Sequence, residues 1–218
     1  MQVLVLYRKL RKFHNNEPVA SVRVPTNRNC LFLKMNYSKQ NRKSYIEISK
    51  IFFWTATINN WYHLLAEDVT KQIILNSLSN LPSRKKITVY AFVIMPNHVH
   101  FIWQTNELNG KETAQGSFLK YTAHEFKKYL QANNPKFLSQ FRVDSSNKEY
   151  EFWQRDSLAF ELNQKDTAIQ KLEYLHNNPL AAHWQLADNP IKYHYSSAKY
   201  YETEIDDFGF LNHLMDMF

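Results

Sequence analysis

The stretch from Val89 to Gln104 constrains the fold of this chain most, because it predicts two adjacent strands joined by a tight turn. Its two halves are rich in β-branched and aromatic residues, and they flank Met95-Pro96-Asn97, where proline removes a backbone hydrogen-bond donor. Successive side chains of a strand point to opposite faces, so His98 and His100 are expected on one face. The hairpin therefore presents two neighbouring imidazoles, called the paired histidines below.

The spacing of the paired histidines supports two interpretations. Their Cβ atoms would lie about 7 Å apart, close enough for two neutral imidazoles to converge on one metal ion. The same spacing also fits a half-exposed pair that binds no metal. The spacing alone leaves both interpretations open.

The segments around the hairpin complete an α+β pattern. Hydrophobic periodicity predicts strands at 51–58, 87–94, 98–104 and 149–154, and helices at 68–78, at 117–131 and from Asp166 onward. We expect residues 79–82 to end the first helix, 132–147 to form a loop, and Asp166 and Thr167 to cap the last helix. This order predicts a ferredoxin-like or RRM-like α+β sandwich with a central antiparallel sheet and an added C-terminal helix.

Composition excludes several kinds of site. Three glycines are too few for a P-loop or a dinucleotide fingerprint, and the single cysteine, Cys30, excludes a disulfide framework and a cysteine-rich zinc site. The apolar start, Met1 to Tyr7, is too short for a signal-peptide core or a membrane span. We therefore expect a soluble, cytoplasmic protein with no membrane partner.

The net charge of +7 is concentrated near the start of the chain. Residues 1–43 contain ten Lys or Arg and one acidic residue, Glu17, whereas residues 44–218 contain seventeen basic and nineteen acidic residues. We predict a basic, loosely ordered extension at 1–47 and a folded domain at 48–218. The extension fits a tail that contacts phosphates without reading sequence, and it fits equally a solvated segment with no partner.

Four motifs resemble those of a known family. Residues 94–102, Ile-Met-Pro-Asn-His-Val-His-Phe-Ile, resemble the His-hydrophobic-His signature of the HUH single-strand endonucleases, and more narrowly of the insertion-sequence-200-like single-tyrosine transposases and the REP-associated tyrosine transposases. Residues 172–180, Leu-Glu-Tyr-Leu-His-Asn-Asn-Pro-Leu, resemble the late helix of that family. Residues 152–156 and 193–200 are similar to the REP-associated branch. The resemblance covers about Ile51 to Lys199.

The resemblance implies an HUH-type fold and a transposase that nicks single-stranded DNA and transfers the cut strand. Tyr174 would be the nucleophile and would form a 5′-phosphotyrosine intermediate. Asn178, four residues later on the same helix face, would join His98 and His100 as a metal ligand. The family implies Mg²⁺ or Mn²⁺, although these ligand types by themselves favour zinc, nickel or copper.

The residue after Asn178 affects this ligand assignment. Pro179 is expected to keep Asn178 out of the α-helical region, so the helix should end there. His176 and Asn177 are then the alternative ligands.

The implied partner is single-stranded DNA with hairpin, palindromic ends. Arg155 is a candidate DNA-binding residue, together with its neighbour Gln154, because a guanidinium can pair with a phosphate or stack on a base. Lys120 and Lys127 are expected on a helix, where they follow the DNA backbone or are merely solvated. The resemblance leaves both a monomer and a homodimer open.

Two other functions compete with this interpretation. A non-catalytic protein could use the same fold to bind a nucleic-acid hairpin. A zinc hydrolase is the other, but the sequence offers no plausible glutamate base near the paired histidines.

Overall fold

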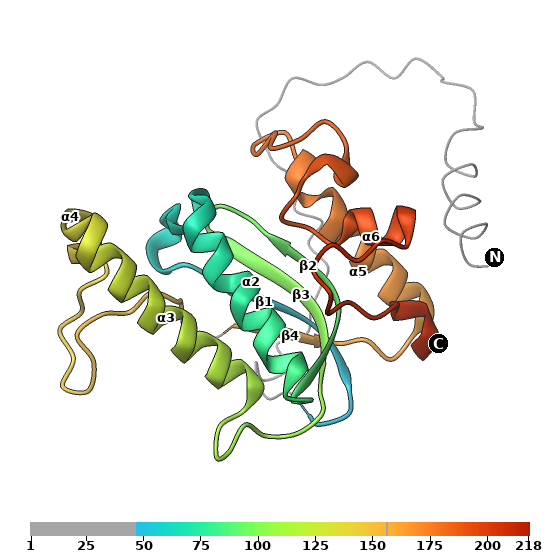
Figure 1. Cartoon of the computed structure of the whole chain (residues 1–218), viewed down its shortest axis with the longest axis horizontal. Coiled ribbons are helices and arrows are strands. Elements are labelled where there is room, and N and C mark those ends of the chain that lie inside the picture. The colour runs from blue at the N-terminus through green and yellow to red at the C-terminus, as the bar shows by residue number, and fades with distance from the viewer. Residues whose placement is uncertain (1–46, 156) are drawn as a thin grey trace, which may run out of the picture. The chain divides into compact units, whose positions relative to one another are not determined.

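The computed structural model describes residues 47–155 and 157–218 (Figure 1). The predicted basic extension, apart from its last residue, Glu47, lies outside these described residues, as does Asp156. The described part of the chain belongs to one compact unit. None of its helices combines the length and the hydropathy that a transmembrane span requires.

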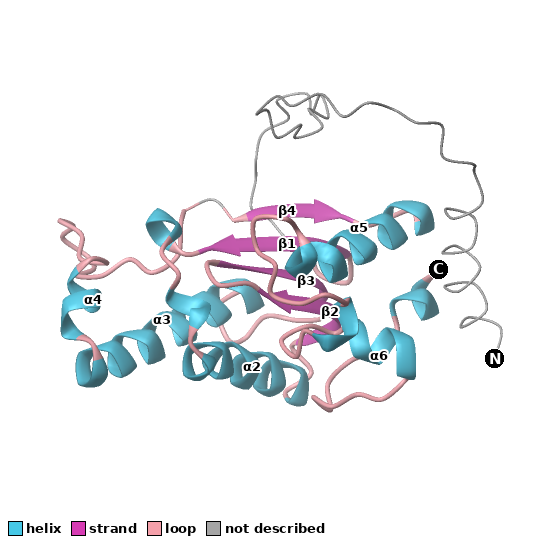
Figure 2. Ribbon diagram, turned by 90° about the horizontal axis from the view of Figure 1, so that it is seen from above, coloured by secondary structure: helices cyan, strands magenta, loops and turns pink. Residues whose placement is uncertain are grey.

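Four strands form one antiparallel sheet in the order β2-β3-β1-β4 (Figure 2). They are β1 (Ile51–Thr57), β2 (Ile87–Ile94), β3 (His98–Thr105) and β4 (Leu158–Glu161). β2 and β3 form the predicted hairpin, and β3 also pairs with β1. Because one helix follows β1 and another follows β3, this is the arrangement of a ferredoxin-like sandwich, and the predicted fold class is confirmed.

Helices cover both faces of the sheet. α2 (Asp68–Ser83) and α3 (Ala114–Asn133) lie on one face, and α5 (Lys165–Asn177) and α6 (Ala198–Thr203) lie on the other (Figure 1). The shorter turns are α4 (Pro135–Ser139), η1 (Asn59–Trp61), η2 (Leu64–Ala66), η3 (Asn178–Leu180), η4 (Pro190–Lys192) and η5 (Leu214–Met217). α5 is the added C-terminal helix that the sequence predicts.

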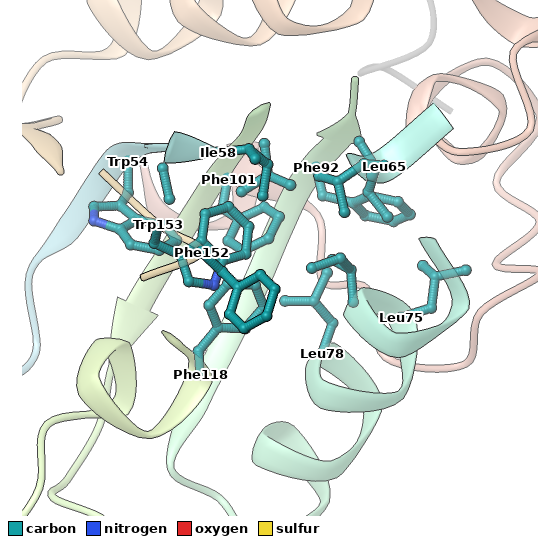
Figure 3. Packing of buried hydrophobic residues seen from close by; sticks show 14 of the residues in the cluster. Trp54, Ile58, Leu65, Leu75, Leu78, Phe92, Phe101, Phe118, Phe152 and Trp153 are labelled. Atoms are coloured by element: carbon teal, nitrogen blue, oxygen red, sulfur yellow. The ribbon is translucent and has the colours of Figure 1, made fainter. Parts of the chain in front are cut away.

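The alternation of side chains along the strands divides the hydrophobic core between the two faces. Trp54 of β1 lies opposite Phe101 of β3 in the register, and both rings pack edge-on against Phe118 of α3 (Figure 3). Ile102 belongs to a separate hydrophobic cluster on the opposite face of the sheet, which includes side chains of α5. The paired histidines share the parity of Ile102 along β3, so they lie on the face that α5 covers.

The predicted fourth strand at 149–154 is wrong, because β4 begins only at Leu158. The earlier segment makes two isolated bridges, Trp153 with Ile58 and Tyr150 with Arg142, in place of a ladder. Phe152 and Trp153 are both buried, although they are adjacent, and the Trp153 indole N–H donates to the Thr122 hydroxyl at 3.0 Å. A strand that exposes one face cannot bury two successive side chains in the same layer.

α2 continues beyond the predicted end at residue 78 and includes Pro82. Leu81 is buried in the core, which favours another helical turn. In that turn the Ser83 hydroxyl donates to the carbonyl of Asn80 at 2.7 Å. Tertiary burial therefore outweighs the turn signal of residues 79–82.

Two other predictions about helix boundaries are also wrong. α4 lies within the predicted loop 132–147, because the Asn134 side chain caps it and Pro135 occupies its first position. α5 begins at Lys165, so Asp166 and Thr167 lie inside its first turn and do not cap it. The charge of Asp166 is still favourable there, since the N-terminal end of a helix dipole is positive.

Candidate active site

The paired histidines lie on β3 beneath α5, and both are buried, with His98 8% and His100 5% exposed. Thr55 is the residue of β1 opposite His100, and its hydroxyl lies 2.7 Å from Nδ1 of that ring. Asn97 places its Oδ1 atom 2.7 Å from Nδ1 of His98. Each imidazole is therefore held through its Nδ1 atom.

These hydrogen bonds set the same tautomer in both rings. Since Oδ1 of Asn97 accepts, Nδ1 of His98 carries the proton. The amide nitrogen of Asn178 lies 3.2 Å from Nε2 of His100, so Nε2 accepts and Nδ1 donates to Thr55. The two rings lie 4.7 Å apart between centroids. Nε2 of His98 is bonded to no side chain among the described residues, whereas Nε2 of His100 would become available to a ligand once the Asn178 amide turned away.

Burial also keeps both imidazoles neutral. It lowers the pKa of His98 to about 4, with a smaller contribution from the charge of His183. Burial likewise holds the pKa of His100 well below its usual value, and the charges of His98 and Lys171 act in the same direction. At neutral pH the pair is therefore in the deprotonated form that binds metal ions.

Tyr174 lies beside this pair. It projects from α5 with its ring edge-on to His100, 5.5 Å between centroids, and it also contacts Phe53 of β1. The residue is 52% exposed, so one side of the phenol is open to a ligand from solution. Burial of the other side raises the pKa of the phenol, and a hydrogen bond with Asn178 partly opposes this shift.

The prediction that Pro179 keeps Asn178 out of the α region is wrong. Asn178 has φ −54° and ψ −43°, and the chain continues directly from α5 into the 3₁₀ turn η3. Proline is tolerated at the start of a helical turn because its missing N–H would be unpaired there anyway. The helical rotation therefore continues and keeps Asn178 on the face of Tyr174, within reach of His100.

The two alternative ligands make other contacts. His176 is 1% exposed, and its Nε2 atom lies 2.9 Å from the hydroxyl of Ser197. Its ring packs against Tyr201, and burial lowers its pKa to about 3. The side chain of Asn177 donates to the carbonyl of Glu173 at 2.8 Å. α5 thus turns these two residues away from the face that carries Asn178.

The donor set fits a divalent cation with open coordination positions. Two neutral imidazoles each offer an Nε2 lone pair, and turning the Asn178 amide by half a rotation would present its oxygen to the same place. No cluster of three His, Cys, Asp or Glu able to hold a metal occurs in residues 47–155 and 157–218. The remaining ligands would thus come from water or a bound phosphate.

Lys171 brings an unpaired cation to the site. It lies one helical turn before Tyr174, and its Nζ atom is 5.8 Å from the Tyr174 ring centroid, 5.4 Å from that of Phe53 and 5.6 Å from that of Phe160. In the part of the chain that the structure describes, it forms no salt bridge with a carboxylate. Partial burial lowers the pKa of its ammonium group.

The predicted DNA-binding residues bond to other partners, although Gln154 does so next to the site, since Thr57 lies opposite His98. Lys120 and Lys127 lie on α3, across the sheet from α5, where they pair with Glu112 at 2.6 Å and Glu149 at 3.2 Å. Arg155 is exposed and pairs with Glu151 at 3.1 Å. Gln154 is half-buried, and its backbone N–H donates to Thr57. Their role in DNA binding stays a prediction.

Sequence reasoning missed three residues of the site: Thr55, Asn97 and Lys171. Asn97 and Lys171 have a local signal, since one adjoins His98 and the other precedes Tyr174 by three residues on a helix. Thr55 has none, because only the pairing of β1 with β3 brings it to His100.

Comparison with known proteins supports the fold. No protein-family model and no curated protein matches the chain. Among solved structures it is similar to a REP-associated tyrosine transposase bound to a REP hairpin, with 16% identity over 72% of this chain and 81% of the other, and a TM-score of 0.50. A candidate transposase of Deinococcus radiodurans matches with 14% identity over 62% of this chain and 94% of the other, and a TM-score of 0.34. At such identities the first likeness establishes a shared fold.

Proposed function

We propose that this chain is a single-tyrosine HUH transposase of the REP-associated type, which nicks single-stranded DNA beside a hairpin and transfers the cut strand. The carrying observation is that α5 places the Tyr174 phenol next to His100, with Asn178 bonded to both side chains. The motifs in the sequence and the fold shared with a hairpin-bound transposase support the same assignment.

The reaction begins at the hydroxyl of Tyr174. Its oxygen attacks the phosphorus of a phosphodiester, the new P–O bond to tyrosine forms, and the bond to the 3′ oxygen breaks. The phenol loses its proton to water, and the departing 3′ oxygen gains one from water. Because a phenol has a pKa near 10, the tyrosine phenolate is also a good leaving group, so a 3′ hydroxyl can attack the phosphotyrosine, release Tyr174 and join strands.

Residues around the phenol prepare it for this step. His98, His100 and Asn178 would hold Mg²⁺ or Mn²⁺, which when bound supplies charge neutralisation at the phosphate. Thr55 and Asn97 hold the two imidazoles through Nδ1, which leaves Nε2 as the binding atom of each ring. On His100 that atom would be freed when the Asn178 amide turns its oxygen toward the ion. The ammonium of Lys171, close to the Tyr174 ring, favours the phenolate and the phosphate electrostatically.

The test is formation of a covalent protein–DNA adduct. A single strand with a hairpin and unpaired flanks, incubated with the protein and Mn²⁺, should give an adduct that resists denaturing electrophoresis. Tyr174→Phe should abolish it, because the ring is kept and only the nucleophilic oxygen is lost. Tyr121→Phe is the matched control, since Tyr121 is also exposed but lies on α3. An adduct that survives Tyr174→Phe would refute the proposal.

The rival function is non-catalytic binding of a nucleic-acid hairpin. One observation favours it: Asn178 donates to Nε2 of His100, so both nitrogens of that ring have a partner without a metal ion. Tight hairpin binding with no adduct in Mg²⁺ or Mn²⁺ would support this rival.

A further inference from the structure

The turn after β1 has an unusual backbone. Asn60 and Trp61 are consecutive residues with φ of +54° and +56°, in the left-handed region. Asparagine tolerates this region, but for a bulky aromatic residue it is a true outlier. Such strain persists only where the surrounding structure fixes it, and it is concentrated at functional sites.

Hydrogen bonds to two neighbouring segments hold this turn. The N–H of Ile58 donates to the carbonyl of Asn97 at 2.8 Å, and the N–H of Asn59 donates to Phe152 at 2.7 Å. After the turn, the N–H of Leu65 donates to Pro96 at 2.9 Å. The turn is therefore rigid, and its geometry is set by the β2–β3 hairpin and by the segment before β4.

Core packing does not explain why a tryptophan occupies this strained position. Trp61 is 59% exposed, the largest exposed fraction among the described large hydrophobic residues, whereas Ile58, Leu64 and Leu65 around it are fully buried. A large aromatic ring held outward on a rigid turn is a surface for stacking.

Trp61 is connected to the candidate active site. Its carbonyl accepts from the side-chain amide of Asn97 at 3.4 Å, and the other end of that amide accepts from His98. His98 also contacts Trp184, with ring centroids 5.9 Å apart, and Trp184 contacts His63 at 5.7 Å. We call Trp61, His63 and Trp184 the aromatic rim.

We propose that Trp61 stacks on an unpaired nucleobase adjacent to the phosphodiester that the paired histidines and Tyr174 receive. This inference rests on the proposed function, since the aromatic rim adjoins a histidine of the site: Trp184 contacts the His98 ring, and Trp61 is joined to His98 through Asn97. Stacking tolerates any base because every base has a π-face, so Trp61 would hold the strand without reading its sequence.

The experiment measures binding separately from cleavage. In a Tyr174→Phe background, a fluorescent hairpin with unpaired flanks is titrated and its anisotropy followed. Trp61→Ala should weaken binding by about 5- to 150-fold, the loss typical of one stacked base, whereas Trp61→Phe should keep most of the affinity. Tyr121→Ala, an exposed aromatic residue on α3, should leave the affinity unchanged.

Abasic substitutions identify the stacked base. Removing the base from one unpaired nucleotide should weaken the binding of that strand to the Tyr174→Phe protein. On the same abasic strand, adding Trp61→Ala should not lower the affinity further.

Trp61→Gly separates stacking from misfolding, because glycine adopts positive φ without strain. It should unfold at the same temperature or a higher one, yet bind DNA as weakly as Trp61→Ala.

Several results would overturn this inference. Unchanged affinity in Trp61→Ala, or a loss that is the same for every abasic strand, would exclude a stacked base. A change in the oligomeric state of Trp61→Ala, measured as its molecular mass in solution, without a change of affinity would assign Trp61 to a contact between copies of the chain.

If the wild type forms no adduct but its binding depends on Trp61, only the nicking proposal fails. If the adduct forms and Trp61 has no effect, only this inference fails. Absence of hairpin binding refutes both.

Discussion

Thr55 controls the orientation of His100 through one hydrogen bond. Thr55→Val should leave Nδ1 of His100 buried without a partner, so the ring loses its fixed tautomer. We expect Mn²⁺ affinity, measured by calorimetry, to fall by about 10- to 100-fold, the usual effect of removing such an orienting partner. Thr57→Val is the matched control. Thr57 lies on β1 like Thr55 and is opposite His98 of β3, but no hydrogen bond joins the side chains of Thr57 and His98. Equal affinities in both variants would contradict this role for Thr55.

Lys171 should act through its charge. At about 6 Å and an effective dielectric constant of about 20, its attraction for an anion is roughly 2–3 kcal/mol before solvent screening. Lys171→Met keeps the apolar contact with Phe53 and Phe160 but removes the charge, so adduct formation should slow by about tenfold or more while hairpin affinity changes less. Lys171→Arg should restore much of the rate.

The control for this charge lies on the same helix. Lys165 is exposed in the first turn of α5, and the one bond of its ammonium group within residues 47–155 and 157–218 goes to the carbonyl of Phe218. Lys165→Met should therefore leave the rate of adduct formation unchanged. An equal loss in both variants would indicate a general effect of helix charge.

At the scale of elements, the position of Tyr174 depends on how α5 packs against the sheet. Leu175 is fully buried in the cluster beneath α5, so Leu175→Ala should cost about 2–5 kcal/mol of unfolding free energy and loosen the helix. We expect slower adduct formation at temperatures where the protein remains folded, because the phenol is no longer held beside His100.

Ile74→Ala is the matched variant for α2. Ile74 is equally buried, but on the opposite face of the sheet. It should lower the unfolding free energy by a similar amount and leave adduct formation intact well below the melting temperature. Loss of activity in Ile74→Ala under those conditions would show that packing on both faces controls the site.

The element predictions were right where a local pattern and burial agree, as in β1, β2, β3 and α5. The error at residues 149–154 has a physical cause: aromatic content favours a strand, but Phe152 and Trp153 are both drawn into the core under α3. Asn178 was misjudged in a similar way, because the rule for a residue before proline is local and the 3₁₀ turn η3 continues the helix.

At the scale of the whole molecule, the positive charge of residues 1–43 lies outside the described domain. We expect a chain without these residues to bind DNA more weakly and with a smaller dependence of affinity on salt, because fewer counterions are released. Adduct formation on a hairpin strand should persist, since every residue of the candidate site lies beyond position 54.

Titration of the hairpin strand at several salt concentrations, with and without residues 1–43, measures this difference. An identical salt dependence of affinity in the two chains would indicate that the basic segment does not contact the DNA. The alternative outcome, loss of the adduct itself, would mean that the segment is part of the site.

The sequence by itself determined the type of fold and the adjacency of the paired histidines, because these follow from the periods of strands and helices. The four-residue spacing of Tyr174 and Asn178 suggested a shared helix face, but only the structure, in which η3 continues α5, showed that Asn178 keeps to it. Tertiary structure alone decided that Thr55 holds His100, that α5 lies over the paired histidines, and that Trp61 stands exposed beside Asn97. These contacts join residues far apart in the chain, and they depend on strand register and on how helices pack against the sheet, which no local pattern specifies.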